Sequence, residues 1–230
     1  MGLRCLLVGA GAVLLSAAAT TVADPIQFKH YLTDAEMLAD LGPHRVAVAE
    51  GRMGNNALNG DFELDLGPDT SAPAVTRQRV WTNGQAVPFV LAYNPLIDQL
   101  TFLVGTELMV WSQPSDITEL YFRAASTKAG ASVTLSDLDL TGQALGVTVA
   151  ANGVDKDLLR VRSASLVDGF VLTGDATFAW DPANRPLRSH LAFQIKMGSA
   201  PLVVPLPPAA LGGLVLLAGL ATVRFVRARR

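Results

Sequence analysis

The central part of the chain is a series of short apolar runs in which β-branched and aromatic residues alternate with polar ones. Alternation with a period of two is expected of strands that bury one face. The runs recur about every ten residues, with no helical pattern between them, which is typical of an antiparallel β-sandwich or jelly roll. The predicted strands are 46–50, 62–66, 79–81, 87–93, 100–104, 107–111, 117–124, 133–140, 145–151, 158–165, 170–173, 177–180 and 191–196.

Three dipeptides between these runs have the composition of tight hairpin turns. They are Asn83-Gly84, Asn152-Gly153 and Asp168-Gly169. Asparagine, aspartate and glycine tolerate the positive φ angles of a type I′ turn. Each dipeptide therefore predicts a hairpin between the runs on either side of it.

One short helix is predicted before the first of these runs. Thr33-Asp34-Ala35-Glu36 is a capping box, in which the threonine and glutamate side chains bind the first amides of a helix. Leu32 and Met37 have the spacing of a hydrophobic staple, and Gly42-Pro43 provides a stop. The pattern predicts a helix over 34–41.

The first 23 residues have the composition of a secretory signal peptide. One positive charge, Arg4, precedes an uncharged apolar stretch, and small residues follow it. We expect cleavage after Ala23, with Thr21 at position −3, and Ala19 is the other candidate. The only cysteine, Cys5, would leave with this peptide, so that the mature chain would have no thiol.

The C-terminal part is predicted to cross a membrane once. No charge occurs between Lys196 and Arg224, and a helix over 207–226 would be roughly 30 Å long, which matches the hydrocarbon core of a bilayer. The tail arginines should stay on the cytoplasmic side and place the N-terminus outside; they are Arg224, Arg227, Arg229 and Arg230. The chain is thus divided into a signal peptide (1–23), an ectodomain (24–199) and a C-terminal segment (200–230).

The charges are unevenly distributed along the chain. All 20 acidic residues lie between Asp24 and Asp181, whereas five of the 18 basic residues belong to the two terminal segments. The ectodomain keeps 13 basic against 20 acidic residues, a net charge of −7. A surface that is this acidic repels phosphate backbones, which excludes nucleic acid as a partner.

A cluster of carboxylates is the weak candidate for a metal site. Asp61, Glu63 and Asp65 alternate along a predicted strand and so share one face, and Asp69 follows after a turn. Calcium prefers such oxygen ligands. However, alternate residues of a strand diverge from any single point, and carboxylates are ordinary on a solvated sheet face. We therefore expect no metal and no cofactor.

The sequence lacks a local signature of catalysis. His30, His44 and His190 have no metal-ligand spacing, and no Gly-x-Ser-x-Gly nucleophile elbow is present. The sequence thus predicts a protein that is not an enzyme, and a secreted hydrolase is the least favoured alternative.

The aromatic residues allow two interpretations. An exposed set could stack against sugar rings, but Phe178 and Trp180 share one face of a predicted strand, and such pairs more often build a core. The candidates are Trp81, Trp111, Trp180, Tyr93 and Tyr121. The core is favoured, and a carbohydrate-binding module for exopolysaccharide stays as the alternative function.

The C-terminal segment resembles a sorting signal. Val204-Pro205-Leu206-Pro207 is followed by Pro208-Ala209-Ala210, a Gly/Leu/Ala-rich helix and the arginine tail. This order is similar to the PEP-CTERM class, in its Val-Pro-Leu-Pro-Ala form, although Leu206 replaces the glutamate of the parent motif. The resemblance implies that an exosortase-type membrane protease recognises the proline motif and removes the helix. A plain single-pass anchor is the alternative.

The ectodomain resembles the choice-of-anchor domains, with subtype W as the suggested subtype. The residues that carry the resemblance are Gly51-Arg52-Met53-Gly54, Asn59-Gly60-Asp61-Phe62-Glu63-Leu64 and Val80-Trp81-Thr82-Asn83-Gly84-Gln85. These domains are β-rich bacterial ectodomains that occur with different C-terminal anchors. Both resemblances imply an exported protein of the cell envelope or extracellular matrix, with signal peptidase and an exosortase as processing partners.

Overall fold

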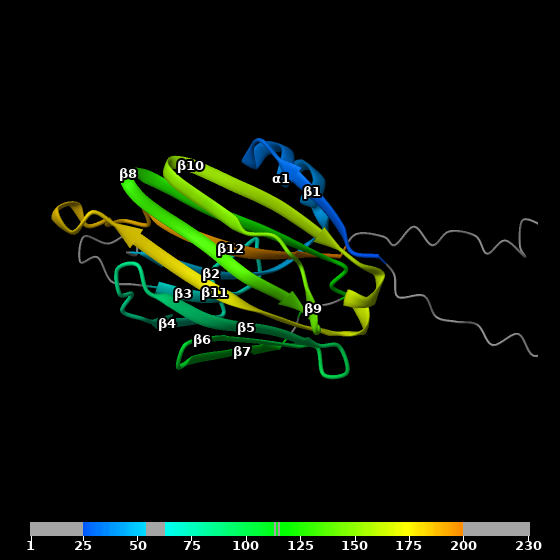
Figure 1. The fold of residues 1–230 in the computed structure, drawn as a ribbon. Helices are drawn as coiled ribbons and strands as arrows, with labels where there is room; N and C mark the ends of the chain where they lie inside the picture. The colour runs from blue at the N-terminus through cyan, green and yellow to red at the C-terminus, as the bar shows by residue number, and fades with distance from the viewer. Residues whose placement is uncertain (1–24, 54–62, 113, 115, 200–230) are drawn as a thin grey trace, which may run out of the picture.

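The structure of the chain is a computed structural model that describes residues 25–53, 63–112, 114 and 116–199. Twelve strands and one α-helix make up most of this part (Figure 1). The helix is α1 (Asp34–Leu41), and short 3₁₀ helices occupy Gly42–His44, Ala164–Asp168 and Pro182–Asn184. The strands are β1 (Gln27–Tyr31), β2 (Arg45–Met53), β3 (Glu63–Gly67), β4 (Val75–Gln78), β5 (Ala86–Asn94), β6 (Gln99–Val104), β7 (Glu107–Ser112), β8 (Glu119–Leu140), β9 (Gln143–Ala144), β10 (Val149–Arg162), β11 (Phe170–Trp180) and β12 (Leu191–Gly198).

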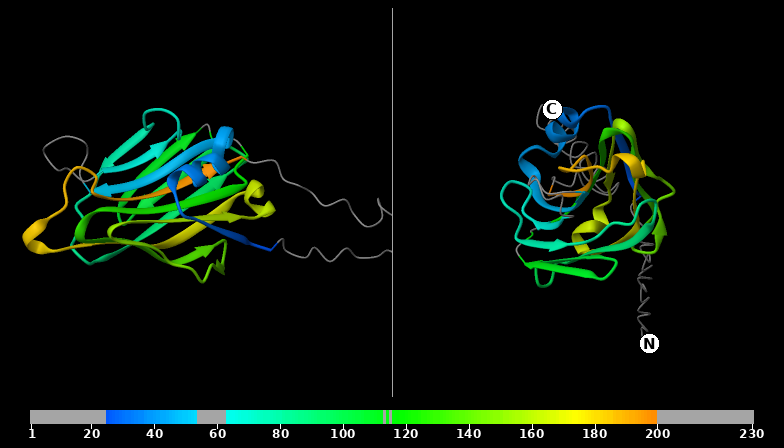
Figure 2. Two further views of the ribbon diagram at one scale, coloured as in Figure 1. Left: turned by 90° about the horizontal axis from the view of Figure 1, so that it is seen from above. Right: turned by 90° about the vertical axis from the view of Figure 1, so that its left-hand side faces the viewer.

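All twelve strands belong to one antiparallel sheet, which confirms the prediction of an all-β fold with one short N-terminal helix. The main order is β4-β3-β2-β12-β8-β11-β5-β6-β7; β10 and β9 also pair with β8, and β1 pairs with β10. The sheet curls until β4 and β7 come into contact, so that the body is nearly closed and barrel-like. Viewed along the body, the strands surround a common interior (Figure 2, right).

Two long strands make the sheet continuous where the sequence predicts separate strands. β8 spans the predicted strands 117–124 and 133–140, and it pairs with β12 through its first half and with β11 through its second half. β10 follows β8 on the other side, and both turn back at the left in Figure 1. A sandwich would divide the strands between two sheets. Here β8 and β10 connect them into one continuous sheet.

The prediction of a hairpin at Asn152-Gly153 is wrong. The dipeptide lies within β10, at a shift of register between Asn152 and Val154. Gly153 has φ +69° and is the one residue of β10 between these two positions, opposite the four residues 128–131 of β8. Because both sides of the dipeptide pair with β8, the backbone bends and the strand continues.

The hairpins predicted at the other two dipeptides are also absent, because the segments on either side of each do not pair with each other. Asn83-Gly84 forms a turn in which Gln85 N–H donates to the Thr82 carbonyl at 3.1 Å, and Asn83 also bonds the backbone of Trp180. Asp168-Gly169 ends a 3₁₀ helix before β11 begins. The predicted strand 79–81 is irregular, and β1 and β4 were not predicted.

Helix α1 has the predicted bounds and the predicted cap. The Thr33 side chain accepts a hydrogen bond from Glu36 N–H at 3.1 Å, and the Glu36 carboxylate accepts one from Leu32 N–H at 3.0 Å. Met37 is buried, but Leu32 is 91% exposed. The hydrophobic staple is therefore absent, because Leu32 points into solvent rather than onto the helix.

Aromatic rings fill the interior of the curled sheet. Trp81 packs edge-on against Phe178 at a centroid distance of 4.4 Å, and Phe193 contacts both of these rings as well as Phe89. The packing leaves no room at Gly51 on β2, where an added Cβ would lie 2.4 Å from the Phe193 ring. Leucine, valine and methionine side chains surround the rings.

The first and the last residues of the described body lie at the same edge of the fold. Gln27 pairs with Arg162, Arg162 with Glu119, and Glu119 with Gly198. These residues lie in one row across four adjacent strands, so Gln27 and Gly198 are about 14 Å apart. In Figure 1 this end is at the right, opposite the bends of β8 and β10.

Candidate functional site

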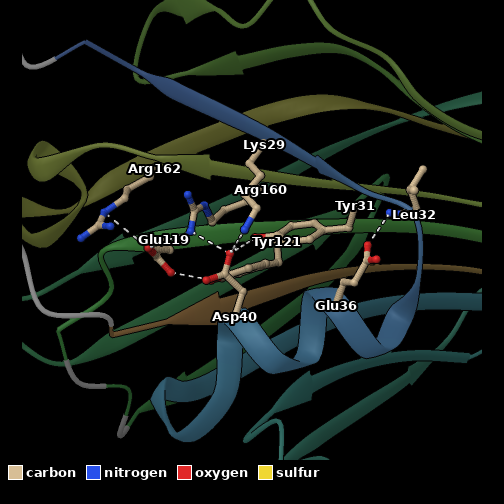
Figure 3. A network of polar contacts seen from close by, with 9 residues as sticks. All are labelled: Lys29, Tyr31, Leu32, Glu36, Asp40, Glu119, Tyr121, Arg160 and Arg162. Atoms are coloured by element: carbon tan, nitrogen blue, oxygen red, sulfur yellow. Dashed lines mark hydrogen bonds and ion pairs between the residues drawn. The ribbon is translucent and has the colours of Figure 1, made fainter.

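The largest group of interacting polar side chains in the described part lies between α1 and the outer face of the sheet (Figure 3). Met37 and Leu41 of α1 pack on this face with Tyr31, Tyr121 and Leu158, in a small cluster separate from the main core. The ion pairs at its margin hold the helix in place.

Asp40 at the end of α1 receives three donors. Its Oδ2 lies 2.8 Å from Lys29 Nζ and 3.0 Å from Arg160 Nη1, and the Tyr31 hydroxyl donates to the same oxygen. Burial alone would raise the pKa of Asp40, but the hydrogen bonds from Lys29 and Tyr31 outweigh it and lower that pKa. Burial, followed by the hydrogen bond to Asp40, raises the pKa of Tyr31 well above its usual value.

Glu119 continues the network toward the end of the sheet. The Tyr121 hydroxyl donates to Glu119 Oε2 at 2.5 Å, and the other oxygen lies 3.4 Å from Arg162 Nε and 3.8 Å from Arg160 Nη1. Only 2% of the Glu119 side chain is exposed. Burial and then the hydrogen bond to Glu119 raise the pKa of Tyr121 strongly.

The first turn of α1 is held separately. Arg123 Nε lies 2.7 Å from Asp34 Oδ1, and Lys156 binds the other oxygen of the same carboxylate. Burial raises the pKa of Asp34, but the hydrogen bonds from Arg123 and Lys156 outweigh it, so that the pKa is lowered. Both ends of the helix are thus joined to the sheet by buried or half-buried ion pairs.

The network contains residue types that act as general acids and bases, but the pKa values of Asp40, Tyr31 and Tyr121 do not suit that role near neutral pH. A general acid or base needs a pKa near the working pH. Asp40 is shifted away from neutrality on the low side, and Tyr31 and Tyr121 on the high side. A shallow cavity of about 420 Å³ lies beside Lys29, Tyr31 and Asp40. The arrangement suits attachment of a helix better than proton transfer.

Two of the three candidate metal ligands, Glu63 and Asp65, form ion pairs with Arg52. Glu63 and Asp65 share one face of β3, as predicted, while Asp61 lies outside the described residues. Arg52 Nη2 lies 2.7 Å from Asp65 Oδ2, and Arg52 Nε lies 3.1 Å from Glu63 Oε2. Within the described ranges no group of three or more His, Cys, Asp or Glu side chains is arranged to hold a metal ion.

Buried carboxylates surround this arginine. Burial raises the pKa of Glu50, against the hydrogen bond from Gln194, and burial followed by the charge of Glu63 raises the pKa of Asp65. Thr76 donates to Asp65 at 2.8 Å, and Asp69 pairs with Lys196. A guanidinium thus lies among the carboxylates that were considered for calcium.

The three histidines belong to different segments: His30 to β1, His44 to the first 3₁₀ helix and His190 to the turn before β12. The His30 side chain is 63% exposed and lies 3.9 Å from Asp157. Nδ1 of His190 is buried and has no hydrogen-bond partner among the described residues. His44 is half-buried at the end of the 3₁₀ helix Gly42–His44.

The aromatic residues considered for sugar stacking belong to the core, as the sequence favours. Trp81, Tyr93 and Tyr121 are buried, and Trp111 and Trp180 pack against the core with part of their surface exposed. Tyr121 lies under α1. A flat exposed aromatic platform is therefore missing at these five positions.

The predicted processing and membrane residues lie outside the described residues. These are Ala23, Val204, Pro205, Leu206 and Pro207, together with Arg224, Arg227, Arg229 and Arg230. In the part that is described, no helix has the length and apolar character that crossing a membrane requires.

The network under α1 was not predicted from the sequence, although the sequence contains a signal of it. Glu119, Tyr121 and Arg123 alternate in β8 with Leu120, Phe122 and Ala124, which face the core. Arg160 and Arg162 alternate in the same way in β10. Charged residues at alternate positions of two neighbouring strands, near an amphipathic helix, indicate a face on which the helix can be held by ion pairs.

No model of a protein family matches the chain, and no curated protein matches it either.

Proposed function

We propose that the chain is an exported protein of the cell envelope or extracellular matrix, with a non-catalytic β-body and a C-terminal sorting signal. A signal peptide over 1–23 would direct the body outward, and a membrane helix over 207–226 with its arginine tail would hold the C-terminus on the inner side. An exosortase-type protease would then recognise the proline motif and pass residues 24–199 to the surface or the medium.

The observation that carries this proposal is the order of features after Gly198. Within 32 residues the chain contains the proline motif 204–207, a charge-free stretch of membrane-spanning length and four arginines. Prolines at 205 and 207 fix φ near the polyproline value and favour extended backbone at the residues before them. This is the conformation in which a protease binds a substrate.

The geometry of the body supports the same topology. Gln27 and Gly198 lie about three strands apart at one end of the sheet. A body that is attached at both ends during export can therefore stand on the membrane with that end toward it. The paired charges under α1 and around Arg52 support the non-catalytic part of the proposal, because their residues are held in structural contacts.

The decisive experiment changes the proline motif in a host that has an exosortase. Pro205→Ala with Pro207→Ala should let the membrane helix extend backward by about a turn, since alanine favours the helix. The double variant should then accumulate at full length in the inner membrane, while the unchanged protein is found shortened at the surface or in the medium. Mass spectrometry of both fractions reads out the cleavage.

Pro201→Ala is the matched control, because it removes a proline three residues before the motif. It should be processed like the unchanged protein. If the unchanged protein stays at full length in the membrane, the chain has a plain anchor and the sorting proposal is wrong.

A further inference from the structure

The turn between β5 and β6 presents two large apolar side chains to solvent. Leu96 is 91% exposed and Ile97 is 57% exposed. The Asn94 side chain accepts a hydrogen bond from Leu96 N–H at 3.1 Å, which fixes the start of the turn. Exposed apolar side chains that lie side by side can bind an apolar surface, whereas singly scattered ones are ordinary.

This turn lies at the end of the body from which both chain termini leave. Phe170 pairs with Tyr93 near the end of β5 and lines a cavity of about 350 Å³ together with Ile26, the residue before β1. Leu96 and Phe170 also line the neighbouring cleft of about 840 Å³. Figure 1 shows the β5–β6 turn at the right, where β1 begins and β12 ends.

The chain after β12 is too short to carry this end far from a membrane. Eight residues, 199–206, separate Gly198 from Pro207, the start of the predicted membrane helix. Even fully extended, this stretch reaches at most about 30 Å. A surface held so close to a bilayer meets it at an effective concentration in the millimolar range, so a weak apolar contact is sufficient.

We propose that Leu96 and Ile97 insert into the interfacial layer of the bilayer that holds the C-terminal helix. The inference rests on the proposed membrane anchor and adds a second point of contact, which would fix the orientation of the body on the membrane. A lipid surface fits the tip better than a protein groove does, because the tip is convex and the short C-terminal connection brings it to the membrane. Asp98 beside it favours zwitterionic over anionic head groups.

An exposed valine elsewhere on the body provides a matched comparison. Val154 is 77% exposed. Val154 lies at the bend of β10, opposite Thr127 of β8, and therefore at the far end of the body. If the body stands on the membrane as proposed, Val154 is directed away from the lipid.

The experiment labels single cysteines in the full-length chain. Cys5→Ser removes the only native thiol, and Leu96→Cys or Val154→Cys then accepts an environment-sensitive fluorophore. The protein is reconstituted in phosphatidylcholine vesicles, with and without brominated acyl chains. The label at 96 should be quenched by brominated lipid and become about tenfold less accessible to iodide than the label at 154, because iodide does not enter the apolar layer.

The outcomes separate this inference from the anchor on which it rests. If the protein floats with the vesicles but the label at 96 is as accessible to iodide as that at 154, the lipid contact is wrong and the anchor stands. If the protein does not float with the vesicles, the anchor and the contact are both overturned. Protection from iodide without quenching by brominated lipid would assign the tip to a second copy of the chain, which also overturns the contact.

Discussion

The two outer faces of the barrel-like sheet differ in the side chains that they present. On β2, β8, β10 and β12 the outward positions include eight charged residues that all take part in ion pairs: Glu50, Arg52, Glu119, Arg123, Lys156, Arg160, Arg162 and Lys196. On β5, β6 and β7 the outward positions include no charged residue. They are Ala86, Pro88, Val90, Ala92, Asn94, Gln99, Thr101, Leu103, Leu108, Val110 and Ser112.

The difference shows that strands with the same alternating pattern can present either a face that binds another element or a face that stays in solvent. The charged face receives α1 and buries part of its ion pairs, so the loss of one charge leaves its partner in a poorly solvated place. The outward side chains of the uncharged face are exposed or half-exposed and remain solvated. We therefore expect substitutions to be costly on the first face and nearly neutral on the second.

The largest effect is expected for Glu119→Gln. The substitution keeps the shape but leaves Arg160 and Arg162 without the carboxylate between them, which should cost about 3 kcal/mol of unfolding free energy. For a body of this size the midpoint of thermal unfolding should fall by roughly 6–12 °C. Thermal denaturation of residues 24–199, followed by circular dichroism, checks this, and a change below about 1 kcal/mol would contradict the role of the network.

A smaller effect is expected at the helix cap. Thr33→Ala removes the acceptor for Glu36 N–H and should cost about 1 kcal/mol. Because α1 lies on the surface of the sheet, the loss should appear first as faster amide exchange in 34–41, with β8 and β12 unchanged. Thr33→Ser keeps the hydroxyl and should restore slow exchange. Equal acceleration in the strands would mean that the helix and the sheet unfold together.

The two halves of the charged face should respond to pH in opposite directions. The pKa of Asp40 is lowered in the folded protein, so its stabilisation is present above the ordinary value of 3.8 and is lost as the pH falls through the folded pKa. The pKa of Glu50 is raised above 4.5, so its contribution is present at lower pH and is lost as the pH rises through the folded pKa.

Urea unfolding at several pH values separates these contributions. Asp40→Asn should reduce the loss of stability below about pH 4, and Glu50→Gln should reduce the decline just above pH 4.5. If both variants kept the pH profile of the unchanged protein, the pKa shifts of these carboxyls would not contribute to stability.

The smallest effect is expected on the uncharged face. Val110 is 42% exposed on β7, and Val110→Lys should change the unfolding free energy by no more than about 0.5 kcal/mol. Thr101→Ala on β6 provides a second test of the same face. A loss above about 2 kcal/mol at either position, or a change of oligomeric state in sedimentation, would show that this face is covered in solution.

The sequence predicted what depends on neighbouring residues. Thr33, Glu36 and Gly42 set the bounds of α1 through local hydrogen bonds, and alternation identified the core positions of most strands. The aromatic residues were also assigned correctly to the core. These features depend on contacts a few residues apart or on the two-residue period of a strand, both of which can be read along the chain.

The rest depended on pairing between distant segments. The dipeptide Asn152-Gly153 suits a hairpin turn and a bend within a strand equally well. Only the pairing of the residues on both of its sides with β8 shows that it is a bend. Asp40 and Arg160 meet across 120 positions, because β10 lies beside β1 and beneath α1. No local pattern specifies which strand lies under the helix, so the network could not be located in advance.

The place of β12 in the sheet has a consequence for when the body can fold. The hydrogen-bonded path from β2 to β8 passes through β12, the last strand of the described body. Until it is made, β2, β3 and β4 have no ladder to the rest of the sheet, although they are among the first strands synthesised. Contacts between residues so far apart in sequence form slowly. The body therefore acquires its closed form only after translation has reached residue 198, when the proline motif and the apolar segment are the next parts of the chain to emerge.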